Sequence, residues 1–130
     1  MHIAIGILLA LVGLINFAPI MGVIGAERLS ALYEYSFEDP NLVLLMRHRA
    51  VLFGLVGGLI FYSIYQPSLQ PLAMGAALIS MLSFIVLGVM DTPFGDFNAA
   101  IRKVMWVDVV GLVLLGGAIA LSLLQTRAVP

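Results

Sequence analysis

The stretch that decides the fold is AIRKVMWVDVVGLVLLGGAIALSLL, residues 100–124. It exceeds the roughly 20 mainly apolar residues that a helix needs to cross a bilayer, and it lacks the alternation that is typical of barrel strands. Three further segments share these properties, namely Ile3–Ile24, Leu42–Tyr65 and Pro71–Met90. The sequence therefore predicts an all-α membrane protein, a bundle of four transmembrane helices that forms a single domain over residues 1–130.

The composition supports a membrane protein and excludes several classes of site. The chain is 62% hydrophobic and 10% charged, against about 45–50% and about 25% in soluble domains. It has no cysteine and a net charge of −1, so disulfides and thiolate metal sites are excluded and a nucleic-acid partner has no support. No phosphate-binding glycine loop or metal motif occurs. We expect membrane lipids as partners, and no nucleic acid, cofactor or metal.

The connections between the segments predict how each helix begins. Asp39-Pro40 is typical of an N-cap followed by proline at the first helical position. Pro19 removes a backbone donor and should bend the first segment near Asn16. The first segment is expected to stay as a spanning anchor. The loop Gly25–Asn41 favours a short amphipathic helix at the membrane interface, with an irregular loop as the alternative, because apolar residues recur at helical spacing: Leu29, Leu32, Tyr33 and Phe37.

The basic residues predict an orientation. Four spans place both termini on one side, where only Arg127 is basic, and the remaining basic residues on the other: Arg28, Arg47, Arg49, Arg102 and Lys103. Loops that carry lysine and arginine near the ends of spans usually lie on the cytoplasmic side of the membrane. The loops that carry these charges should therefore be cytoplasmic, and both termini periplasmic.

A layer of polar residues is expected near that charged side. Asp108 lies inside an apolar run, and polar side chains of the other segments fall at a similar depth. The full set is Asn16, Arg47, His48, Arg49, Asp91 and Asp108. Consecutive helical residues point about 100° apart, so the three residues 47–49 cannot all face one site.

Two interpretations of this layer stay open. In the first, arginine and histidine hold the polar head of a ligand whose apolar tail enters the bundle. In the second, Arg49 and Asp108 form an ion pair that locks the bundle, Asn16 bonds near the bend and Arg47 reaches lipid phosphate. Gly54 and Gly58 likewise favour either packing within one bundle or a homodimer seam.

With these features in place, the chain resembles a family of small uncharacterised bacterial membrane proteins that are broadly DoxX-like. The resemblance covers most of the chain and is carried by Leu32-Tyr33, by residues 47–54 (RHRAVLFG), and by Arg102 with Asp108. It implies a multi-pass protein of the bacterial inner membrane and brings no established catalytic residues.

We therefore expect a non-enzymatic bundle that binds a lipid-like or apolar ligand, or a membrane-protein partner, through the polar layer. One alternative is a small membrane enzyme acting on a lipid or isoprenoid, with His48 or Asp108 as its acid–base group. The other is a dimeric transporter that uses Asp108 as its coupling site.

Overall fold

The structure is a computed structural model that describes residues 1–91 and 94–127. Its elements in chain order are α1 (His2–Phe17), η1 (Ala18–Ile24), α2 (Ala26–Tyr33), α3 (Pro40–Tyr65), η2 (Pro67–Leu69), α4 (Gln70–Asp91), η3 (Phe94–Asp96) and α5 (Ala99–Arg127), where η denotes a 3-10 helix. Four stretches are long and apolar enough to cross a membrane, namely His2–Ile24, Pro40–Tyr65, Pro67–Met90 and Ala99–Arg127. The all-α, four-helix fold is thus confirmed, with boundaries that differ from the prediction by a few residues.

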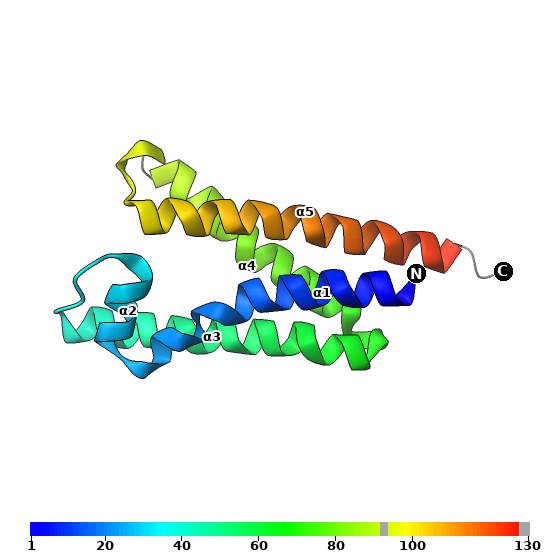
Figure 1. Cartoon of the computed structure of the whole chain (residues 1–130), viewed down its shortest axis with the longest axis horizontal. Helices are drawn as coiled ribbons and strands as arrows, with labels where there is room; N and C mark the ends of the chain where they lie inside the picture. The colour runs from blue at the N-terminus through cyan, green and yellow to red at the C-terminus, as the bar shows by residue number, and fades with distance from the viewer. Residues whose placement is uncertain (92–93, 128–130) are drawn as a thin grey trace.

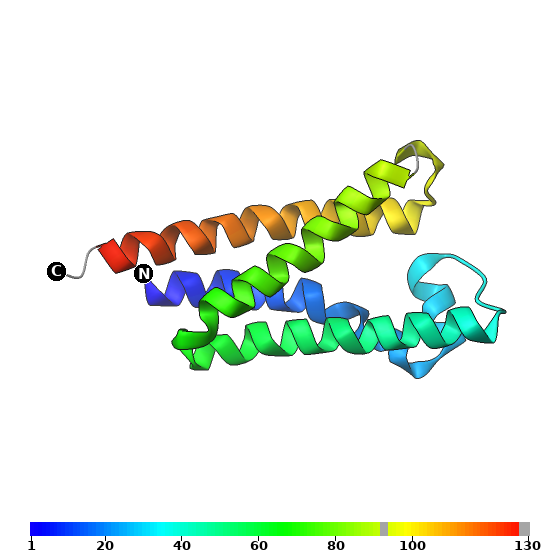
Figure 2. The same ribbon diagram turned by 180° about the vertical axis from the view of Figure 1, so that it is seen from behind.

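The helices form an elongated bundle in which the start of α1 and the end of α5 lie at the same end (Figure 1). Helix α1 packs against both α3 and α5. Helix α4 crosses diagonally from the end of α3 to the start of α5 (Figure 2). We call the opposite end of the bundle, which carries α2 and the two longer loops, the charged end.

The first span changes its helical form where the sequence predicts a bend. Helix α1 ends at Phe17, and a 3-10 helix with Pro19 in its first turn continues to Ile24. Proline cannot donate a backbone hydrogen bond, which explains why the regular α-helix stops here. The chain then turns at Gly25, whose φ of 151° and ψ of −172° belong to a region that is essentially restricted to glycine.

The loop after the first span contains the predicted short helix. Helix α2 buries Leu29 and Tyr33, and Phe37 joins them in a small core at the charged end. This core packs against apolar residues of α3 and α5, such as Met46 and Val104. The amphipathic helix is confirmed, whereas its position relative to the membrane stays a prediction. The predicted cap of α3 also forms, because Asp39 accepts a hydrogen bond of 2.9 Å from the backbone N–H of Asn41.

Glycines let α1 and α3 approach closely. A Cβ atom at Gly57 would lie 2.6 Å from the Cβ of Phe17 and 2.8 Å from its Cα. About one helical turn before Gly57, Gly54 is covered by the side chain of Ile20 in η1. Gly54 therefore packs within one chain. A Cβ at Gly58 would meet nothing within 4 Å, and a homodimer seam there stays a prediction.

Candidate functional site

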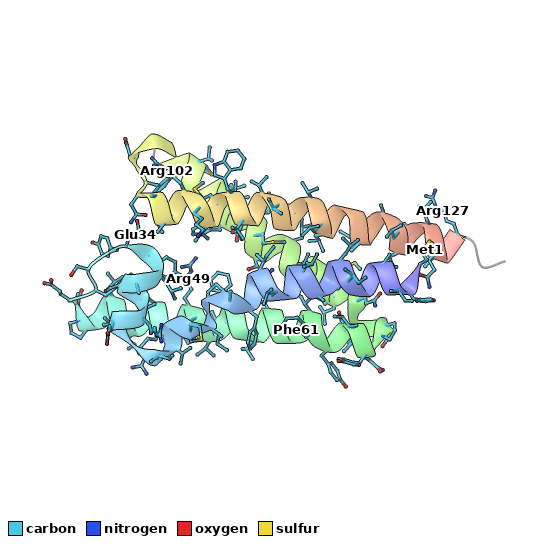
Figure 3. All side chains as sticks on the ribbon, in the orientation of Figure 1. Met1, Glu34, Arg49, Phe61, Arg102 and Arg127 are labelled. Carbon is cyan, nitrogen blue, oxygen red and sulfur yellow. The ribbon has the colours of Figure 1, made fainter. Side chains whose placement is uncertain are left out.

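A cavity of about 520 Å³ lies at the charged end, between the end of α1, η1, α2, α3 and the first turns of α5. Most of its wall is apolar and includes Pro19, Phe53 and Val107. Its polar lining comes from four elements that are distant in sequence: Asn16, Tyr33, Glu34, Arg49, Lys103 and Asp108. Figure 3 shows Arg49 and Glu34 at this end of the bundle, with Met1 and Arg127 at the other.

Aromatic side chains hold the Arg49 guanidinium. Its Cζ lies 4.8 Å from the ring centroid of Phe53, 5.2 Å from that of Phe84 and 5.8 Å from that of Tyr33. Nη1 also donates a long hydrogen bond of 3.4 Å to the Tyr33 hydroxyl. Cation–π contacts within about 6 Å stabilise a charged guanidinium. Arg49 is thus positioned by α2, α3 and α4 together, and it borders the cavity without needing a carboxylate partner.

Asp108 of α5 is a largely buried carboxylate. It is only 9% exposed and lines the same cavity. The positive charge of Arg49 interacts with it electrostatically, yet the two side chains form no ion pair in the part of the chain that the structure describes. The direct Arg49–Asp108 ion pair that one interpretation of the sequence predicts is therefore not found. The guanidinium packs instead against the rings of Tyr33, Phe53 and Phe84, and these cation–π contacts stabilise its charge.

Asn16 lines the same cavity, but its side-chain oxygen is buried. Its Nδ2 donates a hydrogen bond of 3.0 Å to the Val12 carbonyl, and because a carbonyl can only accept, this bond fixes the orientation of the amide. The side chain is 2% exposed. Its Oδ1 is buried and has no hydrogen-bond partner. An unsatisfied buried polar atom costs about 1–3 kcal/mol, and because this oxygen has almost no accessible surface, it is closed to a ligand in the cavity.

The structure brings together only part of the predicted polar layer. Asn16, Arg49 and Asp108 line one cavity, and we call them the polar cluster. Arg47 is exposed, and its Nε donates a hydrogen bond of 2.8 Å to the Val23 carbonyl at the end of η1. It therefore holds η1 against α3.

His48 and Asp91 do not join the polar cluster. His48 is exposed and lines neither of the two cavities described here. The side chains of residues 47–49 point in different directions, as expected for consecutive helical residues that are about 100° apart. Asp91 is the last residue of α4, and its side chain lies outside the described residues.

Asn98 joins α2 to α5, both of which line the cavity, although its role is not apparent from the sequence. Its Nδ2 donates a hydrogen bond of 2.7 Å to the Tyr33 carbonyl, and its Oδ1 accepts one of 2.8 Å from the Ile101 N–H. One side chain thus caps α5 and ties it to the end of α2. An asparagine just before an apolar helix is a recognisable N-cap signal, whereas its bond to α2 depends on the tertiary fold.

A second cavity of about 260 Å³ lies between α3 and α4. It shares Arg49 and Phe53 with the first cavity, and its remaining lining is mainly apolar: Leu52, Val56, Ser80, Ser83, Phe84 and Leu87. The Ser83 hydroxyl donates to the Ser80 carbonyl of its own helix, which leaves little polarity for a ligand. This second cavity is suited to an apolar chain.

Comparisons with known proteins add no assignment. No family model, curated protein or solved structure matches the chain. Among residues 1–91 and 94–127, no group of three or more histidine, cysteine, aspartate or glutamate side chains could hold a metal ion. The function is therefore inferred from the geometry of the two cavities.

Proposed function

We propose that the protein binds a lipid-like amphiphile, with the polar head of the ligand in the first cavity against the polar cluster. The observation that carries this proposal is the largely buried carboxylate of Asp108, which lines the same mainly apolar cavity as Arg49 without forming an ion pair with it in the part of the chain that the structure describes. Buried polar groups in proteins are normally hydrogen-bonded. A headgroup in this cavity would supply the missing partners.

The second cavity offers a place for the tail of such a ligand. It begins at Arg49 and Phe53, which also border the first cavity. Val56 lies about two helical turns, or roughly 10 Å, beyond Arg49 along α3 and away from the charged end. A ligand with its head at the polar cluster and its apolar chain along the α3–α4 surface would place each part in the cavity of matching polarity. An apolar chain buried there gains about 25 cal/mol per Å² of covered surface.

The alternatives have weaker support. An enzyme that uses His48 would need that side chain in a cavity, and it is exposed at the surface. A transporter that uses Asp108 would need a path to both ends of the bundle. Beyond the polar cluster, however, the core is filled by fully buried side chains that include Leu9, Ile60 and Leu115.

The membrane and the orientation also belong to this proposal. We infer that the charged end faces the cytoplasm of a bacterial inner membrane, because the basic residues gather there. The ligand would then be drawn from the cytoplasmic leaflet. The apolar surface of α3, α4 and α5 carries many exposed large side chains, such as Leu55, Ile79 and Val113, which suits contact with lipid.

Lipid analysis of matched variants tests the proposal. The full chain is extracted into polymer-bounded discs and washed extensively with detergent, and the retained lipids are measured by mass spectrometry. Ala100→Phe places a ring in the first cavity, which Ala100 lines. Ala120→Phe makes the same change at an exposed position of α5 outside both cavities. We expect a stoichiometric lipid with wild type and with Ala120→Phe, and its loss with Ala100→Phe. Equal retention by all three proteins, or no retained lipid in any of them, would contradict the proposal.

A further inference from the structure

We propose that the ligand is an uncharged lipid whose head carries a free hydroxyl group, and that this hydroxyl donates a hydrogen bond to the Asp108 carboxylate. This inference rests on the proposed function and names the class of ligand that the first cavity takes. It follows from three features of the cavity, namely an acceptor without a donor, a balanced set of charges and a mainly apolar wall.

The Asp108 carboxylate is an acceptor that no donor reaches within residues 1–91 and 94–127. The residue is 9% exposed and lines the first cavity. In contrast to the Asn16 Oδ1, the carboxylate oxygens are not fully covered. Since buried polar groups in proteins are normally hydrogen-bonded, a ligand in this cavity should bring an O–H or N–H donor to Asp108.

The charges that line the cavity already balance. Arg49 acts electrostatically on Asp108, and its guanidinium packs against three aromatic rings, so it does not require an anion. The exposed residues Glu34 and Lys103 line the same cavity and add one charge of each sign. A cationic head would meet two cations there, and an anionic head would meet two carboxylates. Because like-charge contacts disfavour a partner, this balance favours a head without charge.

The apolar wall distinguishes a hydroxyl from a zwitterionic head. Pro19, Phe53 and Val107 belong to this wall. Moving an ionised group from water into apolar surroundings costs far more than moving a hydroxyl, and a phosphate with an ammonium carries that cost twice. A hydroxyl can offset its own smaller cost with one hydrogen bond to a carboxylate, since bonds to charged groups are stronger than neutral ones. Diacylglycerol is a simple lipid of this class, and its apolar chains suit the second cavity.

Three dioleoyl lipids test the hydroxyl on the full-length wild-type protein. Binding of dioleoylglycerol is measured by native mass spectrometry in one detergent, beside the ether in which the hydroxyl is methylated and the analogue in which hydrogen replaces it. The ether is larger and the deoxy analogue is smaller, but both lack the donor. We expect both to bind roughly tenfold or more weakly than dioleoylglycerol.

Two charged lipids test the absence of charge. Dioleoyl phosphatidylcholine and dioleoyl phosphatidylglycerol have the same chains and are measured in the same detergent. We expect both to bind more weakly than dioleoylglycerol, because their phosphates would lose water in a mainly apolar cavity.

Two carboxylate variants link the hydroxyl to its acceptor. Asp108→Asn keeps the shape of the side chain, but its amide is a weaker acceptor and can donate to the ether oxygen. We expect the affinity ratio of dioleoylglycerol to its ether to fall to about one. Glu34→Gln makes the matched change at an exposed carboxylate of the same cavity and should keep the wild-type ratio. The wild-type series remains decisive if Asp108→Asn does not fold.

The outcomes separate the two proposals. Equal affinity for the alcohol, the ether and the deoxy analogue, or tighter binding of either phospholipid, would overturn the hydroxyl assignment and leave lipid binding itself in place. A ratio that falls with Glu34→Gln and not with Asp108→Asn would overturn the role of Asp108. Failure of every lipid to bind would overturn the proposed function and this inference with it.

Discussion

The close approach of α1 and α3 at Gly57 can be tested by adding a single methyl group. Gly57→Ala would place a Cβ 2.6 Å from the Cβ of Phe17 and 2.8 Å from its backbone N and Cα. Backbone atoms cannot rotate away as the end of a side chain can, so the helices must separate. Overpacking of this kind costs about 1–3 kcal/mol. Gly58→Ala is the matched control, because its Cβ would meet nothing within 4 Å and alanine is the better helix former by about 0.5–1 kcal/mol.

Unfolding of the two variants gives the comparison directly. Both proteins are purified in the same mild detergent and titrated with a denaturing detergent, and the fluorescence of Trp106, the single tryptophan, follows the transition. We expect Gly57→Ala to be less stable than Gly58→Ala by about 1–3 kcal/mol. Equal stability of the two variants would show that α1 and α3 do not approach at Gly57, and it would remove the packing that places Asn16 in the first cavity.

Three further outcomes follow from particular residues. Gly25→Ala should destabilise the protein by about 1–3 kcal/mol, because alanine is strained at the φ of 151° found there, whereas Gly95→Ala should not. Equal thermal midpoints of the two variants would show that position 25 does not require glycine. Asn98→Ala should cost about 1–2 kcal/mol as α5 loses its cap and its bond to α2; unchanged unfolding would refute this role. In this cysteine-free chain, an impermeant thiol reagent added outside intact cells should label Thr126→Cys and not Ser36→Cys, and the reverse pattern would invert the orientation.

The fold could be predicted because lipid imposes one strong requirement. A stretch such as residues 100–124 has to satisfy its backbone internally, and a helix is the only solution for a single apolar segment of that length. The short helix α2 was also predictable, since Leu29 and Tyr33 recur at helical spacing and both are buried.

The site was only partly predictable because the depth of a residue in the membrane does not determine which way its side chain points. Arg47, His48 and Arg49 lie in one turn, yet of the three only Arg49 lines the two cavities described above. The aromatic rings that fix Arg49 include Phe84 of α4, whose proximity depends on how the helices cross. The same holds for Asn98, whose partner on α2 is 65 residues away in sequence. Pairings over such distances have no local signal in a single sequence.

The central claim is that a lipid-like headgroup occupies the polar cluster of Asn16, Arg49 and Asp108. The most direct measurement is an experimental structure of the full chain extracted with its native lipids, without delipidating detergent. We predict density for a headgroup in contact with Arg49 and Asp108, and an apolar chain that continues along α3 and α4. Only ordered water at the polar cluster, or direct closure of Arg49 onto Asp108, would contradict the account.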